Sequence, residues 1–227
     1  MKPEFSVSLM CLDYLRIKEQ IEALNNRADY YHIDIMDGHF CKNVTLSPDF
    51  MRAVKTISRL PFEVHLMTEH PNDFIDMVKD AGADIIAPHA ETINTDAFRV
   101  INKIKSFGLK AGVVLNPATP LEYIKHYIGH LDLVTIMTVD VGYAGQPFIA
   151  EMIDKIRLCK EWKEMYGYSY KIEIDGSCNK NTFKRLYEAG AEEFVMGSSG
   201  LFNLDDDVDN AYTKMLAEFE TETGVSP

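Results

Sequence analysis

The chain has 227 residues, of which 46% are hydrophobic and 26% are charged, as is typical of a globular protein. Its formal net charge of -12 argues against nucleic acid and anionic membranes as partners, although backbone amides can still bind a small anion. No apolar run is long enough to span a bilayer and no amino-terminal signal segment is visible, so we expect a cytoplasmic protein.

Short apolar runs alternate with amphipathic stretches along the whole chain. The runs predicted to be strands lie at roughly 5–9, 30–35, 62–66, 84–88, 110–115, 132–138, 170–174 and 193–197. The predicted helices lie between and after them, at roughly 13–26, 48–58, 71–81, 95–107, 120–128, 149–165, 180–189 and 206–220. No linker divides the chain, so we expect one domain over residues 1–227. Eight strand–helix pairs predict an α/β fold, a (β/α)8 TIM barrel, with an open doubly wound sheet as the alternative.

Single residues predict several helix boundaries. Ser47-Pro48 and Thr119-Pro120-Leu121-Glu122 each place a capping side chain before a proline at the first helical position, and the second has the spacing of a capping box. Gly82, Gly108 and Gly190 mark helix ends that are followed at once by a strand.

Three of the predicted strands carry polar side chains where a buried strand is normally apolar. Side chains alternate between the two faces of a strand, so the polar residues point to one side and the aliphatic residues to the other. The polar residues are His32 and Asp34, Glu63 and His65, and Glu173 and Asp175. If the aliphatic faces are covered, two histidines and two aspartates converge, and their burial is unfavourable unless they bind a cation or do chemistry.

A divalent metal site is the favoured explanation of this cluster. His32, Asp34, His65 and Asp175 fall at or near the carboxyl ends of their strands, where a barrel carries its active site. Two imidazoles and two carboxylates suit one zinc, manganese, cobalt or iron ion. Singly, each residue is more simply a hydrogen-bonded core histidine, or an aspartate in a cap or ion pair. The four together favour a site.

Loops with small residues follow the last three predicted strands. They are Asp140-Val141-Gly142-Tyr143-Ala144-Gly145-Gln146, Gly176 and Gly197-Ser198-Ser199. Each glycine alone could be a plain turn residue. Together the loops predict a phosphate site, because small residues let backbone N–H groups approach an anion and many barrels bind one here.

Sulfur-containing side chains surround the predicted site. Met10, Met36, Met67 and Met137 end four of the strands and fit equally well as core fillers or as a dry wall above a metal. The four cysteines form no C-x-x-C pair, and Cys178 has no activating neighbour in the sequence. We expect reduced thiols that pack rather than react.

Taken in order, these motifs resemble the ribulose-phosphate 3-epimerase family over nearly the whole chain. The matching motifs are Ser8, His32-Ile33-Asp34-Ile35-Met36-Asp37-Gly38, His65-Leu66-Met67, Gly142-Tyr143-Ala144-Gly145-Gln146 and Asp175-Gly176.

Within that family, the details are most similar to the D-allulose-6-phosphate 3-epimerases. The similar positions are Asp140, Ala144, Ser177-Cys178-Asn179 and Glu91-Thr92-Ile93-Asn94. The pentose enzymes more often have asparagine at the position of Asp140, glycine at Ala144 and glycine at Ser177. Two departures from the family pattern are Val141, where proline is usual, and Ala87-Pro88-His89-Ala90, which displaces the proline that normally follows the histidine.

The resemblance implies a (β/α)8 barrel that epimerises a phosphorylated ketose at C3. The C3 proton is adjacent to the C2 carbonyl, and its removal gives an enediolate whose charge a bound metal can stabilise. Inversion returns a proton to the opposite face, so two carboxylates must flank the substrate. By family correspondence, Asp34 and Asp175 fill these roles while they bind the metal with His32 and His65.

The resemblance also implies the substrate contacts. Ser8 and His65 would contact the sugar hydroxyls or carbonyl. The loop residues expected to bind the substrate and its phosphate are Gly142, Tyr143, Ala144, Gly145, Gly176, Ser177, Gly197, Ser198 and Ser199. We also expect a homo-oligomer.

Four functions remain open. The preferred one is interconversion of D-allulose 6-phosphate and D-fructose 6-phosphate, and the first alternative is conversion of D-ribulose 5-phosphate to D-xylulose 5-phosphate. A non-catalytic sugar-phosphate sensor would not need two opposed carboxylates. A decarboxylase or aldol-type synthase would generally need a lysine beside them, and neither Lys42 nor Lys171 is placed convincingly.

Overall fold

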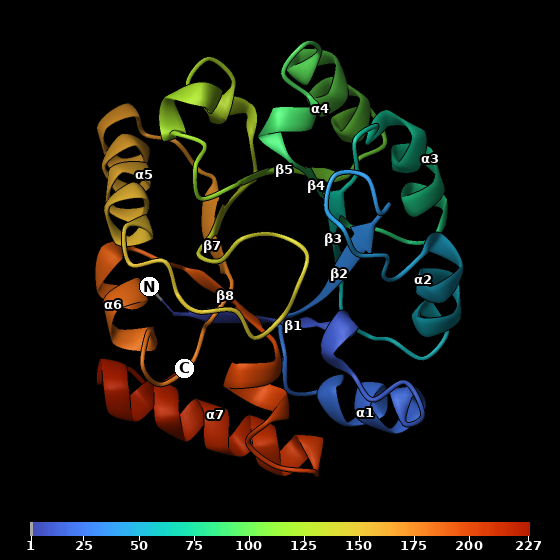
Figure 1. The fold of residues 1–227 in the computed structure, drawn as a ribbon, viewed down its shortest axis with the longest axis vertical. Helices are drawn as coiled ribbons and strands as arrows, with labels where there is room; N and C mark the ends of the chain where they lie inside the picture. Colours follow the sequence, from blue (N-terminus) through green and yellow to red (C-terminus); the bar gives the residue numbers. More distant parts are fainter. Residues whose placement is uncertain (1) are drawn as a thin grey trace.

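The eight predicted strands close into a parallel barrel (Figure 1). In the computed structural model, which describes residues 2–227, each strand pairs with the next in the chain and the last pairs with the first. The strands are β1 (Glu4–Ser8), β2 (Tyr30–Met36), β3 (Phe62–Met67), β4 (Ile85–Pro88), β5 (Lys110–Leu115), β6 (Leu133–Met137), β7 (Lys171–Asp175) and β8 (Glu193–Met196). The predicted TIM barrel is confirmed, and the doubly wound alternative is wrong.

Helices surround the barrel (Figure 1). They are α1 (Ile17–Leu24), α2 (Pro48–Lys55), α3 (Asn72–Asp80), α4 (Ala97–Ser106), α5 (Met152–Tyr166), α6 (Phe183–Ala189) and α7 (Val208–Thr223). Each of these overlaps a predicted helix. Shorter turns follow three strands, at Leu9–Cys11, Ala90–Thr92 and Ser198–Phe202.

The helix predicted over residues 120–128 is wrong. The segment forms two 3-10 turns, Leu121–Ile124 and Ile128–His130. Pro120 is extended, with φ -70° and ψ 154°, and the Thr119 hydroxyl donates a hydrogen bond to Glu91 on another loop. The predicted capping box does not form, because a tertiary contact takes the threonine side chain that would have capped the helix.

Other predicted helix boundaries are confirmed. The Ser47 hydroxyl accepts a hydrogen bond of 3.2 Å from the Phe50 N–H, and Pro48 occupies the first turn of α2. Gly82, Gly108 and Gly190 have φ of 96°, 76° and 117°, values that a residue with a side chain rarely adopts. They end α3, α4 and α6 immediately before a strand.

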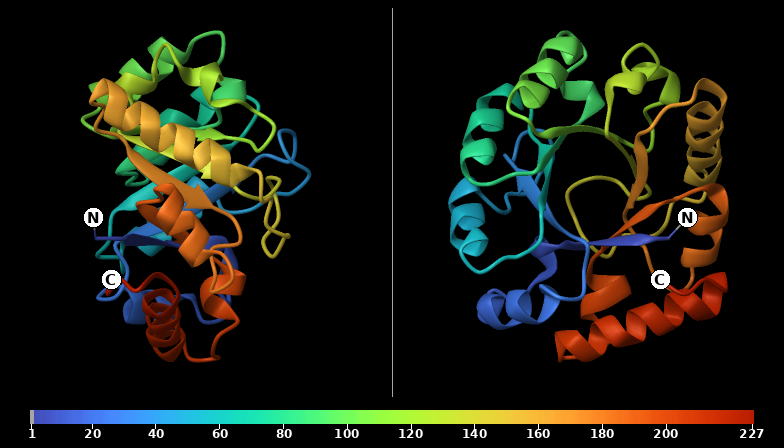
Figure 2. Two further views of the ribbon diagram at one scale, coloured as in Figure 1. Left: turned by 90° about the vertical axis from the view of Figure 1, so that its left-hand side faces the viewer. Right: turned by 180° about the vertical axis from the view of Figure 1, so that it is seen from behind.

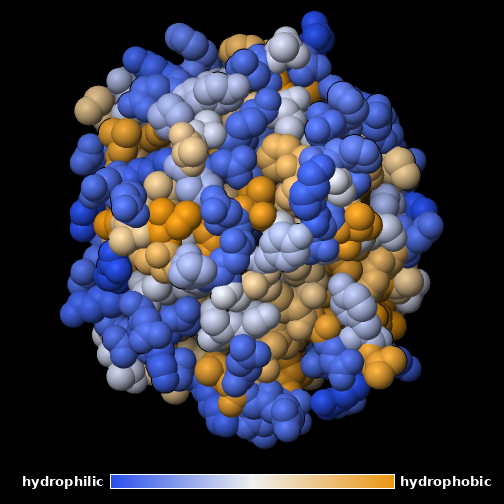
Figure 3. Space-filling view, viewed as in Figure 1, coloured by the Kyte–Doolittle hydropathy of each residue, from blue (hydrophilic) through white to orange (hydrophobic). Residues whose placement is uncertain are grey.

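The two ends of the barrel differ (Figure 2). The loops after β2 and β6 project from the carboxyl ends of the strands, while the two ends of the described chain lie at the opposite end. Seen from the loop side, hydrophilic residues dominate the surface and hydrophobic residues show between them (Figure 3). Among residues 2–227, we find no helix with the length and apolarity that crossing a bilayer requires.

The barrel interior is polar along part of its length. Aliphatic side chains such as Ile33, Val64 and Ile172 are fully buried in the main hydrophobic cluster. The alternate residues face inward, and His32 on β2 lies 3.8 Å from Glu173 on β7, across the barrel. The alternation therefore carries the polar residues of the three strands to a common interior.

Candidate metal centre and substrate cavity

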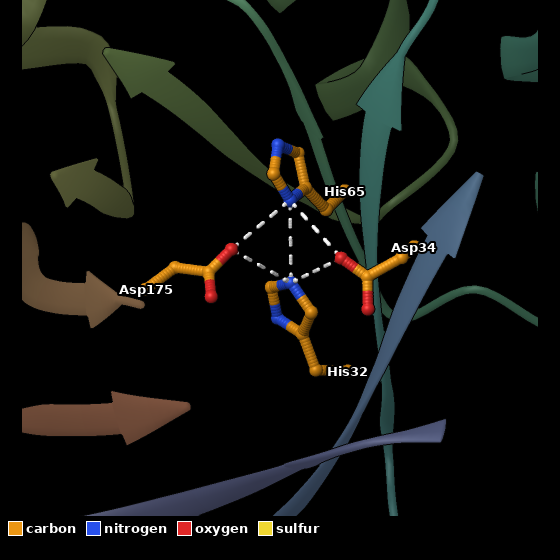
Figure 4. Close-up of side chains that lie close together, drawn as sticks. All are labelled: His32, Asp34, His65 and Asp175. Carbon is orange, nitrogen blue, oxygen red and sulfur yellow. Dashed lines mark hydrogen bonds and ion pairs between the residues drawn. The ribbon is translucent and has the colours of Figure 1, made fainter. Parts of the chain in front are cut away.

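Four side chains from three strands meet at one point near the carboxyl end of the barrel (Figure 4). His32 Nε2 lies 3.4 Å from Asp34 Oδ1 and 3.7 Å from Asp175 Oδ2. His65 Nδ1 lies 3.4 Å from each of the same two oxygens, and the two histidine nitrogens are 3.3 Å apart. In the close-up, the carboxylates approach the histidine pair from opposite sides.

The strand register produces this meeting. Asp34 on β2 is paired with His65 on β3 in the parallel ladder, and His32 lies two residues earlier on the same face of β2. Asp175, the last residue of β7, comes from across the barrel. It is the most accessible of the four, with 16% of its side chain exposed against 5% for Asp34.

The spacing of the four atoms fits a divalent ion. Bonds of about 2.0–2.2 Å from zinc to imidazole nitrogen and carboxylate oxygen place tetrahedral ligands about 3.3–3.6 Å apart. The separation of the two histidine nitrogens, and that of each nitrogen from each of the two carboxylate oxygens, lies between 3.3 and 3.7 Å. All four atoms lie within 4.8 Å of one another. The donor set and its geometry therefore match a single metal ion bound by His32, Asp34, His65 and Asp175.

The surroundings of this centre also favour positive charge. Burial would raise the pKa of Asp34, but the imidazoles of His32 and His65 outweigh it and hold that pKa well below its usual range. Burial would lower the pKa of His32, yet Asp34, Glu173 and Glu63 raise it well above its ordinary value. The point between the four residues thus stabilises a cation, whether protons or a metal ion.

A second layer of acidic residues lies beneath the centre. Glu63 Oε1 is 2.7 Å from His32 Nδ1, and Glu173 accepts a hydrogen bond of 2.6 Å from the Thr135 hydroxyl. Burial, then the charges of Glu173 and Glu193, raises the pKa of Glu63 well above its usual value. Glu63 and Glu173 share strand faces with His65 and Asp175, but they were not among the predicted site residues. The strand alternation that identified the four candidate ligands was also the available signal for these two glutamates.

A cavity opens above the four ligands. It is lined by Asp34 and Asp175, whereas the buried His32 and His65 do not line it. The predicted substrate residues that line it are Ser8, Gly142, Tyr143, Ala144, Gly145, Gly176, Ser177, Gly197, Ser198 and Ser199. All four methionines discussed above, Met10, Met36, Met67 and Met137, line it as well. The predicted substrate residues other than His65 therefore surround one space.

Two loops that are distant in the sequence join over one side of the cavity. The Asn43 side-chain amide donates a hydrogen bond of 2.7 Å to the Gly142 carbonyl, and the Tyr143 hydroxyl donates one of 2.5 Å to the Lys42 carbonyl. Val141, which departs from the family pattern, packs against the cluster that contains Met137 and Val139. The substitution of valine for proline therefore leaves an apolar contact at this position.

The loop after β7 is shaped by two residues with positive φ. Gly176 has φ of 114°, and a Cβ there would lie 2.6 Å from Val139 Cγ2. Ser177 has φ of 50°, and its hydroxyl donates a hydrogen bond of 2.5 Å to the Gln146 carbonyl. Gly176 is thus required for a close approach, while Ser177 ties the β7 loop to the β6 loop.

The Cys178 thiol and the lysine amines offer no alternative chemistry here. Cys178 is buried, and burial raises its thiol pKa well above the usual value, so the thiol is unreactive. Among residues 2–227, no lysine lines the cavity. Lys42 is exposed, and Lys171 pairs with Glu193 at 2.8 Å, at the opposite end of the barrel. This arrangement disfavours the decarboxylase and aldol-type alternatives.

Two residues behind the centre were missed as members of the site. His89 Nε2 lies 2.8 Å from His65 Nε2, and His89 Nδ1 lies 3.3 Å from Glu91 Oε2. Burial lowers the pKa of His89 to about 4. His89 follows the last residue of β4, so the alternation of strand residues gave no indication of its contact with His65.

Known proteins resemble this chain at two levels. The ribulose-phosphate 3 epimerase family model matches residues 4–202. A ribulose-phosphate 3-epimerase of Bacillus subtilis is 42% identical over 194 residues, covering 85% of this chain and 89% of that protein. A ribulose-phosphate 3-epimerase of Methanocaldococcus jannaschii is 38% identical over 204 residues, which cover 89% of this chain and 86% of that protein.

Solved structures of more distant proteins share the fold. A crystal structure of 3-hexulose-6-phosphate synthase superposes with a TM-score of 0.71 at 14% identity, covering 95% of this chain and 99% of that one. A structure of a mutant tryptophan synthase α-subunit from Pyrococcus furiosus superposes with a TM-score of 0.65 at 16% identity, covering 99% of this chain and 100% of that one. These show the barrel alone. The family model and the close relatives show more: the chain belongs to the ribulose-phosphate 3-epimerase family of isomerases.

Proposed function

We propose that the chain is a divalent-metal-dependent 3-epimerase that interconverts D-allulose 6-phosphate and D-fructose 6-phosphate. The observation that carries the proposal is the placement of Asp34 and Asp175 on opposite sides of the paired histidines (Figure 4), where both residues line the cavity. An inversion needs one proton-transferring group on each face of the reacting carbon. A sensor of sugar phosphates would need no such opposed pair.

The four-residue centre would hold the ion. Bound by His32, Asp34, His65 and Asp175, a zinc, manganese, cobalt or iron ion would supply positive charge to stabilise the enediolate oxygens. The chain's own residues move the proton. One aspartate removes it from C3 and the other returns a proton on the opposite face, and their roles exchange in the reverse direction.

The remaining residues would orient the substrate. Ser8, which lines the cavity, and His65 would contact the sugar hydroxyls or carbonyl, and the loops that contain Gly145, Gly176 and Ser198 would receive the phosphate through backbone N–H groups. Met36 and Met67 contribute an apolar boundary to the cavity, which limits water near the enediolate.

The length of the substrate is set between the metal and the phosphate loops. Asp140 and Ser177 line the cavity at this end, and their types, with Ala144 and the segment Ser177-Cys178-Asn179, resemble the allulose-phosphate enzymes. D-ribulose 5-phosphate is the second candidate, and it is favoured by the relatives from Bacillus subtilis and Methanocaldococcus jannaschii, both of which are named ribulose-phosphate 3-epimerases. We also propose a homo-oligomer located in the cytoplasm.

Steady-state assays with each sugar phosphate test the proposal. Metal-stripped protein is reloaded with one defined ion, and kcat/KM is measured for D-allulose 6-phosphate and for D-ribulose 5-phosphate. One additional carbon in a shaped pocket typically changes kcat/KM by roughly ten- to two-hundred-fold. We expect a preference of this size for D-allulose 6-phosphate. A Ser177→Gly variant, which suits the positive φ at this position, should reduce the ratio, whereas Asp154→Asn on the exposed face of α5 should not.

The outcomes separate the parts of the proposal. A higher kcat/KM for D-ribulose 5-phosphate overturns the choice of substrate and leaves the epimerase assignment intact. Failure to turn over either sugar phosphate with any of the four metals overturns the epimerase assignment and favours a sensor.

A further inference from the structure

The two histidines of the centre are held from behind in different ways. His32 contacts the Glu63 carboxyl group directly, at 2.7 Å from Nδ1. His65 has a longer connection, since its Nε2 contacts the Nε2 of a third histidine, His89, and only the far nitrogen of His89 reaches the Glu91 carboxylate.

The hydrogen bonds of this chain fix where each proton lies. A His65 that offers the Nδ1 lone pair to a metal carries its proton on Nε2. That proton is donated over 2.8 Å to His89 Nε2, which therefore accepts. His89 in turn carries its proton on Nδ1, where it faces Glu91 Oε2 at 3.3 Å. A single arrangement satisfies all three residues and leaves the metal-facing nitrogen of His65 unprotonated.

Packing immobilises the chain of hydrogen bonds. His65 and His89 are fully buried, and the Phe40 ring lies 4.5 Å from the His89 ring, centroid to centroid. Glu91 is held in turn, because its Oε1 accepts a 3.1 Å hydrogen bond from the Asn116 N–H and another from the Thr119 hydroxyl. The carboxylate thus has a fixed position from which it can orient His89.

We propose that His89 and Glu91 are positioning residues that hold His65 in the tautomer and orientation needed to bind the metal. This inference rests on the proposed metal site. The positioning role also explains why the Thr119 hydroxyl contacts Glu91 and does not cap the turn at Leu121–Ile124, because the contact holds Glu91 in place. Hydrogen-bond partners behind a ligating histidine typically contribute 10- to 100-fold to metal affinity.

Direct metal-binding measurements on three variants test the inference. His89→Phe keeps a ring beside Phe40 and removes the acceptor of the His65 proton, so we expect the Kd for Co²⁺ to rise about 10- to 100-fold and the visible spectrum of the bound cobalt to change. His89→Gln places a carbonyl oxygen near the former Nε2 and should recover most of the affinity. Lys155→Met removes two hydrogen bonds to the carbonyls of Asn116 and Pro117, in the loop that also holds Glu91. It should leave the Kd within about threefold of the unmodified protein, because His89 remains in contact with His65.

Each result has a defined meaning. Unchanged cobalt affinity and spectrum in a folded His89→Phe protein overturn the inference while the metal site stands. Equal loss in His89→Phe, His89→Gln and Lys155→Met also overturns it, because the residues would then serve only the local fold. If the unmodified protein binds no Co²⁺, the proposed metal site fails, and the positioning role fails with it. If His89→Phe does not fold, the Kd for Co²⁺ is compared between His89→Gln and Glu91→Leu. The inference requires that Glu91→Leu bind Co²⁺ more weakly than His89→Gln.

Discussion

The Ser8 hydroxyl donates a hydrogen bond of 2.7 Å to Asp34 Oδ2. This contact turns the other oxygen, Oδ1, toward His32 and His65, each 3.4 Å away. Asp175 is the more exposed carboxylate of the pair. The two acids that flank the cavity are therefore not equivalent, because Asp34 is fixed by a neighbour while Asp175 is partly accessible to solvent. A fixed carboxylate with an added hydrogen bond is the weaker base.

Replacing either acid should stop catalysis without unfolding the barrel. Asp34→Asn and Asp175→Asn each remove one proton-transferring group, and we expect kcat to fall by about 10²–10⁴-fold. In D₂O, the unmodified protein should incorporate deuterium at C3, as seen by NMR of the product. Ser8→Ala, which removes the hydrogen bond to Asp34 and the proposed contact with the sugar but leaves both carboxylates in place, should lower kcat less. Transfer of the original C3 hydrogen without exchange would instead support a single base.

Removal of the metal should abolish turnover reversibly. Prolonged dialysis against a chelator empties a site built from two imidazoles and two carboxylates, and added divalent ion should restore activity. The check is elemental analysis beside each assay. Full turnover in protein shown to be metal-free would refute the role of this centre.

Glu193 should make the stability of the fold depend on pH. Burial, then the charge of Glu173, raises its pKa to about 7, against 4.5 for an ordinary glutamate. Between these values the folded chain binds a proton that the unfolded chain does not, so the stability from this group is present below pH 4.5 and is lost as the pH rises to 7. The loss is about 3 kcal/mol. Urea unfolding at several pH values checks it, because Glu193→Gln should lack this slope.

Lys171 should stabilise the barrel most at high pH. Its amine lies 2.8 Å from Glu193 and also contacts Glu4, so Lys171→Met leaves a buried carboxylate unpaired and should cost about 3 kcal/mol at pH 8. At pH 5 Glu193 is protonated, and the cost should shrink. Arg157→Met, which breaks an exposed pair with Asp154, should cost less than about 1 kcal/mol at either pH. Equal losses for both variants would contradict the assignment of Lys171 to a buried pair.

The sequence was sufficient for those parts of the site that follow from strand periodicity. His32, Asp34, His65 and Asp175 were identified because an alternation of two carries side chains to a known face, and a closed barrel brings those faces together. The residues lining the cavity followed from the loops after the late strands. In each case local structure determines the position of the side chain.

The parts that failed depend on partners distant in the sequence. Thr119 has the spacing of a capping residue, but the presence of Glu91 within reach is a property of the tertiary fold. His89 lies one residue beyond β4, and its contact with His65 depends on the spacing of two strands at their ends. Glu193 looks like a surface charge at a strand start, and only its pairing with Lys171 explains its burial.

The hydrogen bonds from Asn43 to Gly142 and from Tyr143 to Lys42 join segments about 100 residues apart in the chain. One boundary of the cavity is therefore a single mechanical unit built from two loops. We expect a product that leaves on this side to require both contacts to open, so its release rate should respond to a change in either loop. Loss of the Asn43 amide and loss of the Tyr143 hydroxyl should each increase the rate of product dissociation, although neither group takes part in the proton transfer.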